Sequence, residues 1–142
     1  TAAKKEISFV LDYNTQKELL VEADESKIHQ VLYNLIDNAV KFSHNNSEIK
    51  ISLRKKGAKV FVSVKDSGIG IPKESLNKVF DRFYKTDISR GKDKRGTGLG
   101  LSISKEIIQA HNQTINVVST VDVGTEFVFT LKYHSKKQEA SS

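Results

Sequence analysis

Two glycine-rich stretches are the first candidates for chemistry in this chain. The first, Asp66-Ser-Gly-Ile-Gly-Ile-Pro72, follows an apolar run that predicts a strand. The second, Arg95-Gly-Thr-Gly-Leu-Gly-Leu-Ser102, opens an apolar periodic run that predicts a helix. A glycine-rich turn that leads into a helix N-terminus offers free backbone N–H groups and the positive end of the helix dipole, both of which favour phosphate. We therefore expect an anion site there, and we expect the long loop between the two stretches to act as a lid over a nucleotide.

Three polar side chains add to this chemistry. Asn34, Asn38 and Lys41 recur at steps of four and three residues, which places two amides and an ammonium on one face of a helix. A solvated helix face with incidental amides would show the same spacing, but the neighbouring glycine stretches favour a shared site. Another face of this helix, roughly 120° away at ~100° per residue, is apolar at helical spacing, through Ile28, Leu32, Leu35, Ala39 and Phe42.

The elements that must position these residues follow from periodicity and from turn signals. Strands alternate apolar and polar residues, helices repeat apolar residues every three or four positions, and Gly57 and Gly124 mark turns. The order of strands and helices predicts an α/β (α+β) two-layer sandwich, with one mixed, mostly antiparallel sheet and helices packed on one face. The predicted strands are Glu6–Tyr13, Lys17–Glu22, Glu48–Leu53, Lys59–Lys65, Thr114–Ser119 and Thr125–Lys132, and the predicted helices are Glu25–Phe42 and Leu99–Ala110.

Length and composition set limits on the function. The 142 residues suit a single domain, with a core at about 6–133 and a polar tail at 134–142, and no apolar run approaches a membrane span of ~20 residues. The absence of cysteine excludes disulfides and thiolate metal sites. The net charge of +6 comes from scattered basic residues with no aromatic-interleaved stripe, so we expect no nucleic-acid partner. The absence of methionine indicates a piece of a longer protein.

Taken in order, these motifs resemble the catalytic, ATP-binding domain of two-component sensor histidine kinases. That family belongs to a superfamily with gyrase, heat-shock protein 90 and the mismatch-repair ATPases. The resemblance covers about Glu6 to Tyr133 and preserves the order of the family's motifs. The motif positions are an N box at Asn34–Lys41, a first glycine box at Asp66–Gly70, an F box at Phe80–Tyr84, a second glycine box at Gly96–Leu101 and a last one at Gly124-Thr125.

The resemblance implies catalytic roles and phosphate contacts for one group of residues. Asn38 resembles the asparagine whose amide oxygen binds Mg²⁺, a hard ion that prefers oxygen. Asn34 is similar to a polar partner of the phosphates or of the waters on the ion, and Lys41 to a lysine that contacts phosphate. Lys85 stands where relatives often carry an arginine that reaches the phosphates, and it lacks the bidentate fork of arginine. The second glycine box then supplies backbone amides for phosphate, from Gly96, Thr97, Gly98, Leu99, Gly100 and Leu101.

The resemblance implies that another group binds adenine. Asp66 resembles the carboxylate that accepts a hydrogen bond from the adenine amino group. Gly68 and Gly70 are expected to let the backbone approach the base closely. Tyr84 is similar to an aromatic residue that covers adenine, and Thr125 belongs to the last glycine box. For Phe80 and Phe83 within the F box, we expect packing of the lid against the core.

One departure from the family lies after the second helix. His111-Asn112-Gln113 stands where relatives often carry His-Gly-Gly, so the helix exit is less permissive of positive φ, although asparagine tolerates it. We expect His111 to be structural.

The four histidines decide what the chain can do alone. None of His29, His44, His111 and His134 stands in the Ser-His-Glu/Asp-Leu-Arg context of a phosphoacceptor. The resemblance therefore implies that ATP, with Mg²⁺, phosphorylates a histidine on a separate dimerisation domain, which would serve a response regulator indirectly. It also implies a cytoplasmic domain, monomeric as a fragment, of a homodimeric parent anchored in the bacterial cell membrane. An anti-sigma-factor serine kinase, an ATP-hydrolysing clamp and a binding-only module are the alternatives.

Overall fold

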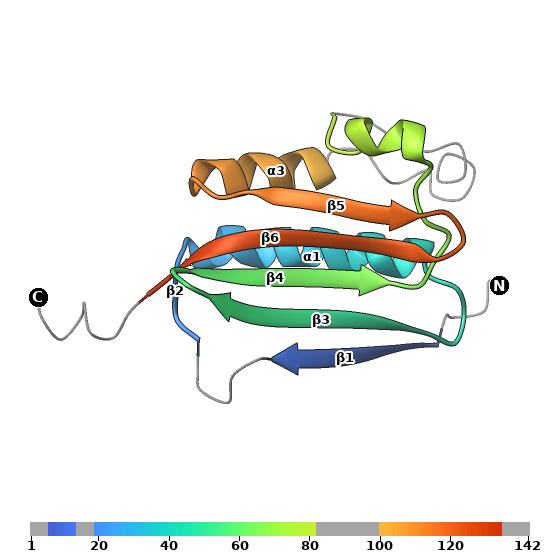
Figure 1. Ribbon diagram of the computed structural model, residues 1–142, viewed down its shortest axis with the longest axis horizontal. Helices are drawn as coiled ribbons and strands as arrows, with labels where there is room; N and C mark the ends of the chain where they lie inside the picture. Colours follow the sequence, from blue (N-terminus) through green and yellow to red (C-terminus); the bar gives the residue numbers. More distant parts are fainter. Residues whose placement is uncertain (1–5, 14–18, 82–99, 135–142) are drawn as a thin grey trace, which may run out of the picture.

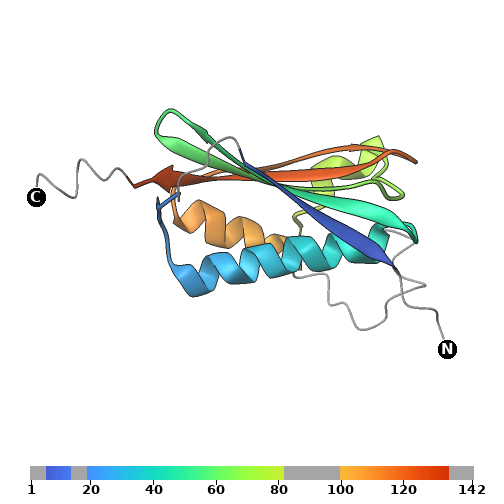
Figure 2. The same cartoon turned by 90° about the horizontal axis from the view of Figure 1, so that it is seen from below.

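The computed structural model describes residues 6–13, 19–81 and 100–134 of the chain (Figure 1). These residues form a six-stranded sheet with two α-helices packed on one of its faces (Figure 2). The strands are β1 (Ile7–Tyr13), β2 (Val21–Glu22), β3 (Ser47–Lys56), β4 (Lys59–Asp66), β5 (Ile115–Thr120) and β6 (Gly124–Tyr133). The helices are α1 (Glu25–Phe42), the 3₁₀ helix η1 (Lys73–Lys78) and α3 (Gly100–Ala110). The predicted two-layer architecture is confirmed.

Helix α1 begins and ends at capping residues. Its N-cap is Asp24, whose carboxylate accepts the backbone N–H of Lys27 at 3.2 Å and thus satisfies one of the free donors of the first turn. After the last turn, the Ser43 hydroxyl donates to the carbonyl of Ala39 at 2.6 Å. The predicted range of this helix, Glu25 to Phe42, is confirmed, and Ile28, Val31, Leu35 and Ala39 are its buried residues.

The sheet runs in the order β1-β3-β4-β6, and β2 and β5 pair with different parts of β6. Four of the five pairings are antiparallel, and only β1 pairs in parallel, with β3, in the described sheet. The mixed, mostly antiparallel sheet is therefore confirmed, although the partner of β1 was not predicted. The face toward the helices carries the core, which includes Ile49, Val62, Val64, Phe127, Phe129 and Leu131.

The predicted strands lie close to the observed ones, and the differences have local causes. β3 runs three residues beyond the predicted Leu53, to Lys56, because a tight turn at Gly57 and Ala58 lets Lys56 pair with Lys59. The predicted Lys17–Glu22 strand is observed as Val21–Glu22, and residues 17 and 18 lie outside the described residues. The segment around Leu76, for which no strand or helix was predicted, forms η1, which lies beside β5 (Figure 1).

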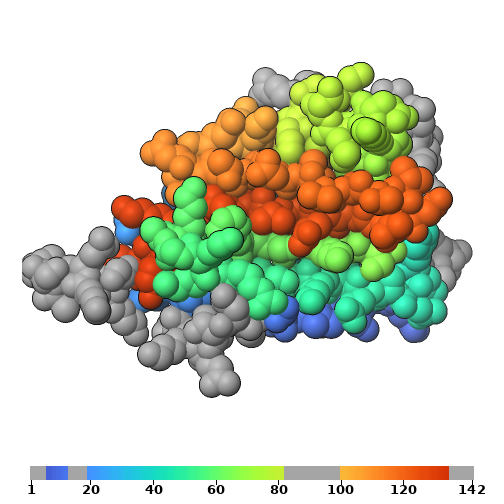
Figure 3. All heavy atoms as spheres, viewed as in Figure 1, coloured from blue at the N-terminus to red at the C-terminus, as the bar shows by residue number. Residues whose placement is uncertain are grey.

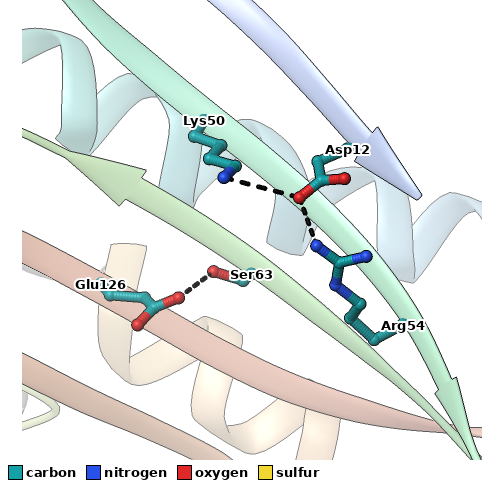
Figure 4. A network of polar contacts seen from close by, with 5 residues as sticks. All are labelled: Asp12, Lys50, Arg54, Ser63 and Glu126. Atoms are coloured by element: carbon teal, nitrogen blue, oxygen red, sulfur yellow. Dashed lines mark hydrogen bonds and ion pairs between the residues drawn. The ribbon is translucent and has the colours of Figure 1, made fainter. Parts of the chain in front are cut away.

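Figure 3 shows the face of the sheet away from the helices, where polar side chains contact one another. On it, the carboxylate of Asp12 contacts the ammonium of Lys50 at 3.5 Å and the guanidinium of Arg54, and the Ser63 hydroxyl donates to Glu126 at 2.5 Å (Figure 4). The ion pairs of Asp12 are partly exposed to water, and such pairs contribute little to stability. Of the helices that the structure describes, none has the length and apolarity needed to cross a membrane.

The segment that follows β4 is packed against the turn between β5 and β6. The backbone N–H of Asp122 donates to the carbonyl of Ile69 at 2.8 Å, and that of Ile71 to the Ser119 hydroxyl at 2.7 Å. Gly70 lies between these contacts with φ +77°, and a Cβ there would lie 2.3 Å from the carbonyl oxygen of Thr120. Gly57 has a similar φ of +63°, but a Cβ there would meet nothing within 4 Å.

This contrast predicts different costs for the same substitution. Gly57→Ala should cost roughly 1–2 kcal/mol of unfolding free energy, because only the backbone conformation is strained. Gly70→Ala should cost about 1–3 kcal/mol more, because the added methyl also overlaps the Thr120 carbonyl. Urea denaturation of both variants measures the difference, and equal losses would show that the segment after β4 is not held against this turn.

Candidate functional site

Helices α1 and α3 lie antiparallel on the sheet, and their contacts locate the site. At one end, the backbone N–H of Asp24 donates to Nε2 of His111, just after α3. At the other end, the side-chain amide of Asn34 donates to the carbonyl of Gly100, the first residue of α3, at 3.1 Å. Asn38 and Lys41 lie about one and two turns further along α1. They therefore project past the beginning of α3, on the flank of α1 predicted from the sequence.

The histidine after α3 has a structural role, as predicted. Nδ1 of His111 lies 2.8 Å from the carbonyl of Ile107, and Nε2 accepts from Asp24 at 3.0 Å. A neutral ring with its proton on Nδ1 satisfies both contacts. The next residue, Asn112, has φ +59°, so asparagine takes the left-handed conformation that ends the helix.

Asp66 ends β4 as a buried carboxylate with a side-chain exposure of only 3%. One of its oxygens accepts the backbone N–H of Gly68 at 2.9 Å, and its register partner across the sheet is Thr125. Burial raises the pKa of Asp66 above its ordinary value of 3.8, while hydrogen bonds from the backbone of Gly68 and Thr125 and the nearby His44 act in the opposite direction. A buried acceptor of this kind suits a ligand that brings its own donor.

Two glycines allow the end of α1 and the start of β6 to lie close to the backbone at Asp66. A Cβ on Gly68 would lie 2.0 Å from the carbonyl oxygen of Phe42, the last residue of α1, and a Cβ on Gly124 would lie 2.1 Å from that of Asp66. The N–H of Ile69 also donates to the Phe42 carbonyl at 3.1 Å. These contacts bring the end of α1, which carries Lys41, to the end of β4. Glycine at these positions, as at Gly70, is therefore required by the protein's own backbone, and the predicted approach of a base stays a prediction.

The other predicted site residues are partly described. Gly100 begins α3 and would accept a Cβ at ordinary contact distance from Asn34. Leu101 packs against the core, and the Thr125 hydroxyl lies 2.8 Å from that of Ser119. Lys41 pairs with Asp37 at 3.1 Å, on a half-exposed part of α1.

Several predictions fall outside the described residues. These are the lid as a whole, Phe83, and the site residues Tyr84, Lys85, Gly96, Thr97, Gly98 and Leu99. Within the F box, Phe80 is described. Its ring meets that of Phe127 edge to face at 6.0 Å, so its predicted packing against the core is confirmed.

Sequence reasoning missed two serines that support the site. Ser104 is fully buried in α3 and accepts from the Asn34 amide at 3.3 Å. Its only signal was a polar residue at a core position of an otherwise apolar helix. The Ser119 hydroxyl contacts the Thr125 hydroxyl and accepts a hydrogen bond from the N–H of Ile71. A serine near the end of a strand does not by itself predict these contacts.

Comparison with known proteins places the chain in a family. Residues 23–135 match the model described as histidine kinase-, DNA gyrase B-, and HSP90-like ATPase. The chain belongs to this family of ATPases. It is similar to the sensor histidine kinase WalK of Bacillus subtilis (strain 168), with 44% identity over 125 residues. That match covers 87% of this chain but 20% of WalK, so the chain spans about one fifth of this relative.

Solved structures similar to this chain support the same family assignment. The catalytic domain of histidine kinase ThkA is 37% identical with a TM-score of 0.75, covering 89% of this chain and 78% of that one. The structure of ThkA in complex with the response regulator protein TrrA matches at 35% identity and a TM-score of 0.73, covering 92% of this chain and 35% of that one. The chain is thus homologous to the catalytic ATPase part of sensor histidine kinases.

The buried carboxylate of this ATPase domain predicts a distinctive pH dependence. The folded state raises the pKa of Asp66, so it holds that proton more tightly than the unfolded chain does. The stability contributed by Asp66 is then fully present below pH 3.8 and is lost as pH rises through the folded pKa. The unfolding free energy of the unaltered domain should therefore fall, relative to Asp66→Asn, as pH is raised from about 3 to 7.

Asp24→Asn is the matched control for that series. Hydrogen bonds from the backbone of Lys27 and the side chain of Ser26 lower the pKa of Asp24, so its contribution is present above pH 3.8 and is lost as pH falls. As pH rises, the unfolding free energy of the unaltered domain should fall relative to Asp66→Asn and rise relative to Asp24→Asn, as measured by urea denaturation across pH. If the unaltered domain instead gained stability relative to Asp66→Asn as pH rises, the raised pKa of Asp66 would be contradicted.

Proposed function

We propose that this chain is a single catalytic domain, with its core at 6–133, that binds Mg²⁺–ATP and transfers the γ-phosphoryl group to a histidine on a separate dimerisation domain. The observation that supports this best is the convergence of two groups of residues. The amide and ammonium flank of α1 reaches past the start of α3, and the contact between Phe42 and Gly68 brings it to the buried carboxylate of Asp66. One end of that site suits phosphates and the other suits a base with an amino group.

At the base end, Asp66 is the proposed acceptor for the adenine amino group. Its burial makes this contact selective, because a base that presents an acceptor there would leave a buried polar group unpaired, at a cost of about 1–3 kcal/mol. Gly68, Gly70 and Thr125 form the surrounding backbone, and Tyr84 is proposed to cover the ring.

At the phosphate end, we assign Lys41 and Lys85 as the cations that contact phosphate. Lys41 pairs with Asp37 across a half-exposed contact, and exposed ion pairs of this kind are worth little, about 0–1 kcal/mol, so exchange of partner is cheap. The N-terminal N–H groups of α3, from Gly100 and Leu101, and the second glycine box before it complete the proposed phosphate contacts.

The residues present fit a magnesium ion. Mg²⁺ takes oxygen ligands and keeps several waters, and it is commonly held by one or two protein groups together with substrate phosphates. Asn38, one turn beyond Asn34 on α1, would supply an amide oxygen near the start of α3. No cluster of three or more His, Cys, Asp or Glu residues occurs in the described part of the chain. When bound, the ion would neutralise charge that develops on the phosphates. Asn38 would hold and orient it.

Hydrolysis of ATP is a less favoured hypothesis for the same site. A hydrolytic clamp needs a base to activate water, and the position one turn before Asn38 is Asn34, an amide that takes up no proton. The Asp37 carboxylate, also on α1, is held by Lys41 at 3.1 Å. A serine kinase of the anti-sigma-factor kind shares this architecture and remains the second candidate.

The proposed partners follow from the relatives. ThkA has been solved with a response regulator, and we propose that the parent of this chain serves one indirectly, through its histidine-bearing domain. We propose further that this domain lies in the cytoplasm, that the isolated chain is monomeric, and that the parent is a homodimer anchored in the bacterial cell membrane. After transfer, ADP would occupy the site.

The metal role of Asn38 gives the first test. Asn38→Ala should weaken ATP binding about tenfold or more with Mg²⁺ present, because an oxygen ligand is lost, and should change it little in EDTA. Gln30→Ala, which removes an exposed amide from the same helix, is the control and should bind ATP normally. Calorimetric titration measures both conditions, and an unchanged affinity of Asn38→Ala for Mg²⁺–ATP would rule out the metal role.

Transfer of radiolabelled γ-phosphate tests the reaction itself. This chain alone should neither label itself nor release phosphate quickly, because transfer depends on a nucleophile held in position and the chain lacks a histidine in acceptor context. Adding the histidine-bearing domain of the parent should produce label on that domain. Label on this chain alone would favour the serine-kinase hypothesis, and rapid release of free phosphate would favour an ATP-hydrolysing clamp.

A further inference from the structure

Two polar side chains connect α1 to the first turn of α3. The side-chain nitrogen of Asn34 donates to the carbonyl of Gly100 at 3.1 Å and to the hydroxyl of Ser104 at 3.3 Å. The Ser104 hydroxyl in turn donates to the same Gly100 carbonyl at 2.9 Å. The three groups therefore form a closed triangle, which we call the α1–α3 latch.

The chemistry of the latch fixes the orientation of the Asn34 amide. A carbonyl oxygen only accepts, so the nitrogen of the amide must face Gly100, and the single hydroxyl proton of Ser104 is already used on the same carbonyl. Both amide hydrogens of Asn34 are thereby directed at α3. What this side chain can offer to a ligand is its oxygen, which does not bind phosphate oxygens directly because both are acceptors.

Ser104 is a costly residue to bury for packing alone. It is 0% exposed and sits in α3 among core residues such as Ile107 and Ile108. A buried hydroxyl costs free energy unless it is hydrogen-bonded, and an apolar residue of similar size would avoid that cost. The hydroxyl instead makes two contacts, to Gly100 and to Asn34, at the end of α3 that faces Asn38 and Lys41.

We propose that Asn34 and Ser104 are positioning residues for the phosphate end of the site. By holding the first turn of α3 against α1, the latch keeps the N-terminal N–H groups of α3 directed toward the place where Asn38 and Lys41 project. This inference rests on the proposed nucleotide function. Of the two roles that family resemblance implies for Asn34, it departs from direct contact with the phosphates, because the amide hydrogens act on α3.

The test compares ATP with adenosine, which lacks the phosphates. Ser104→Ala should bind ATP about three- to tenfold more weakly, as expected for loss of one net hydrogen bond, and should bind adenosine normally. The loss should persist in EDTA, because the latch acts through α3 and not through the metal. Alanine is the best helix former, so the variant should keep its fold, which thermal unfolding checks.

Ser63→Ala is the matched control. It removes another buried hydroxyl with a short contact, to Glu126 at 2.5 Å, on the face of the sheet away from the helices. The ratio of ATP to adenosine affinity should be unchanged in this variant.

Asn34→Asp separates the latch from a role on the metal. The variant keeps side-chain oxygen but loses both donors, so an asparagine that served only to offer oxygen to the cation or its waters would be replaced well. A latch residue would not be, so ATP binding should weaken even with Mg²⁺ present, where the cation offsets the added negative charge. In addition, Asn34→Ala combined with Ser104→Ala should cost little more ATP affinity than Asn34→Ala alone, because contacting residues that act together are not additive.

The outcomes distinguish the two levels of the proposal. If Ser104→Ala leaves the ratio of ATP to adenosine affinity unchanged, the latch is overturned and the proposed nucleotide function stays intact. Full additivity of the two alanine substitutions would also overturn it. If the unaltered chain binds no ATP, the proposed function fails, and the latch as a device for phosphate positioning fails with it.

Discussion

The site depends on three places where backbone meets backbone without room for a side chain. A methyl group at Gly68, Gly70 or Gly124 would lie 2.0–2.3 Å from a carbonyl oxygen of another segment. These contacts join the end of α1, the end of β4 and the turn between β5 and β6 at one point. Side-chain packing against the sheet would hold the same elements some ångströms further apart. The close approach therefore sets where Asp66, Lys41 and Thr125 lie relative to one another.

The same place carries an electrostatic cost. Asp66 is a carboxylate at a depth where its neighbours are Gly68, Thr125 and the core, and burial raises its pKa despite the backbone hydrogen bonds that oppose the shift. Such a group does not favour the folded state at neutral pH. The proposed contact with the adenine amino group would explain its presence, and stability and binding would then be opposed at this residue.

Local pattern predicted most elements of the fold. The range of α1 was predicted because its capping residue Asp24 and its apolar spacing are both local signals, and the hairpin of β3 and β4 because Gly57 marks its turn. The parallel partner of β1 was not predicted, because pairing between segments separated by a helix leaves no trace in the alternation of either strand. The 3₁₀ form of η1 was missed for a related reason, since its shape depends on packing beside β5.

For the site, sequence spacing predicted which face of α1 carries Asn34, Asn38 and Lys41, but not what each side chain contacts. The partner of the Asn34 amide is Ser104, seventy positions away, and it becomes visible only when α3 is placed against α1. The close approach of Gly68 to the carbonyl of Phe42 was also not predicted, and the expected approach of a base to this glycine stays a prediction. Contacts of this kind come from tertiary structure, and short-range patterns do not encode them.

The order of the strands has a consequence for how the molecule holds together. The elements from β1 to β4 form one continuous part of the chain, and α3, β5 and β6 form another. The two parts are joined chiefly along the seam between β4 and β6 and by the contact of the two helices, with β2 also pairing with β6. The residues proposed to bind the nucleotide come from both parts, with Asn38 and Asp66 on one side of the seam and Gly100 and Thr125 on the other. A bound nucleotide would thus act as a reversible cross-link between two halves of one chain. By mass action, its concentration in the cell would then help to set how often those halves separate.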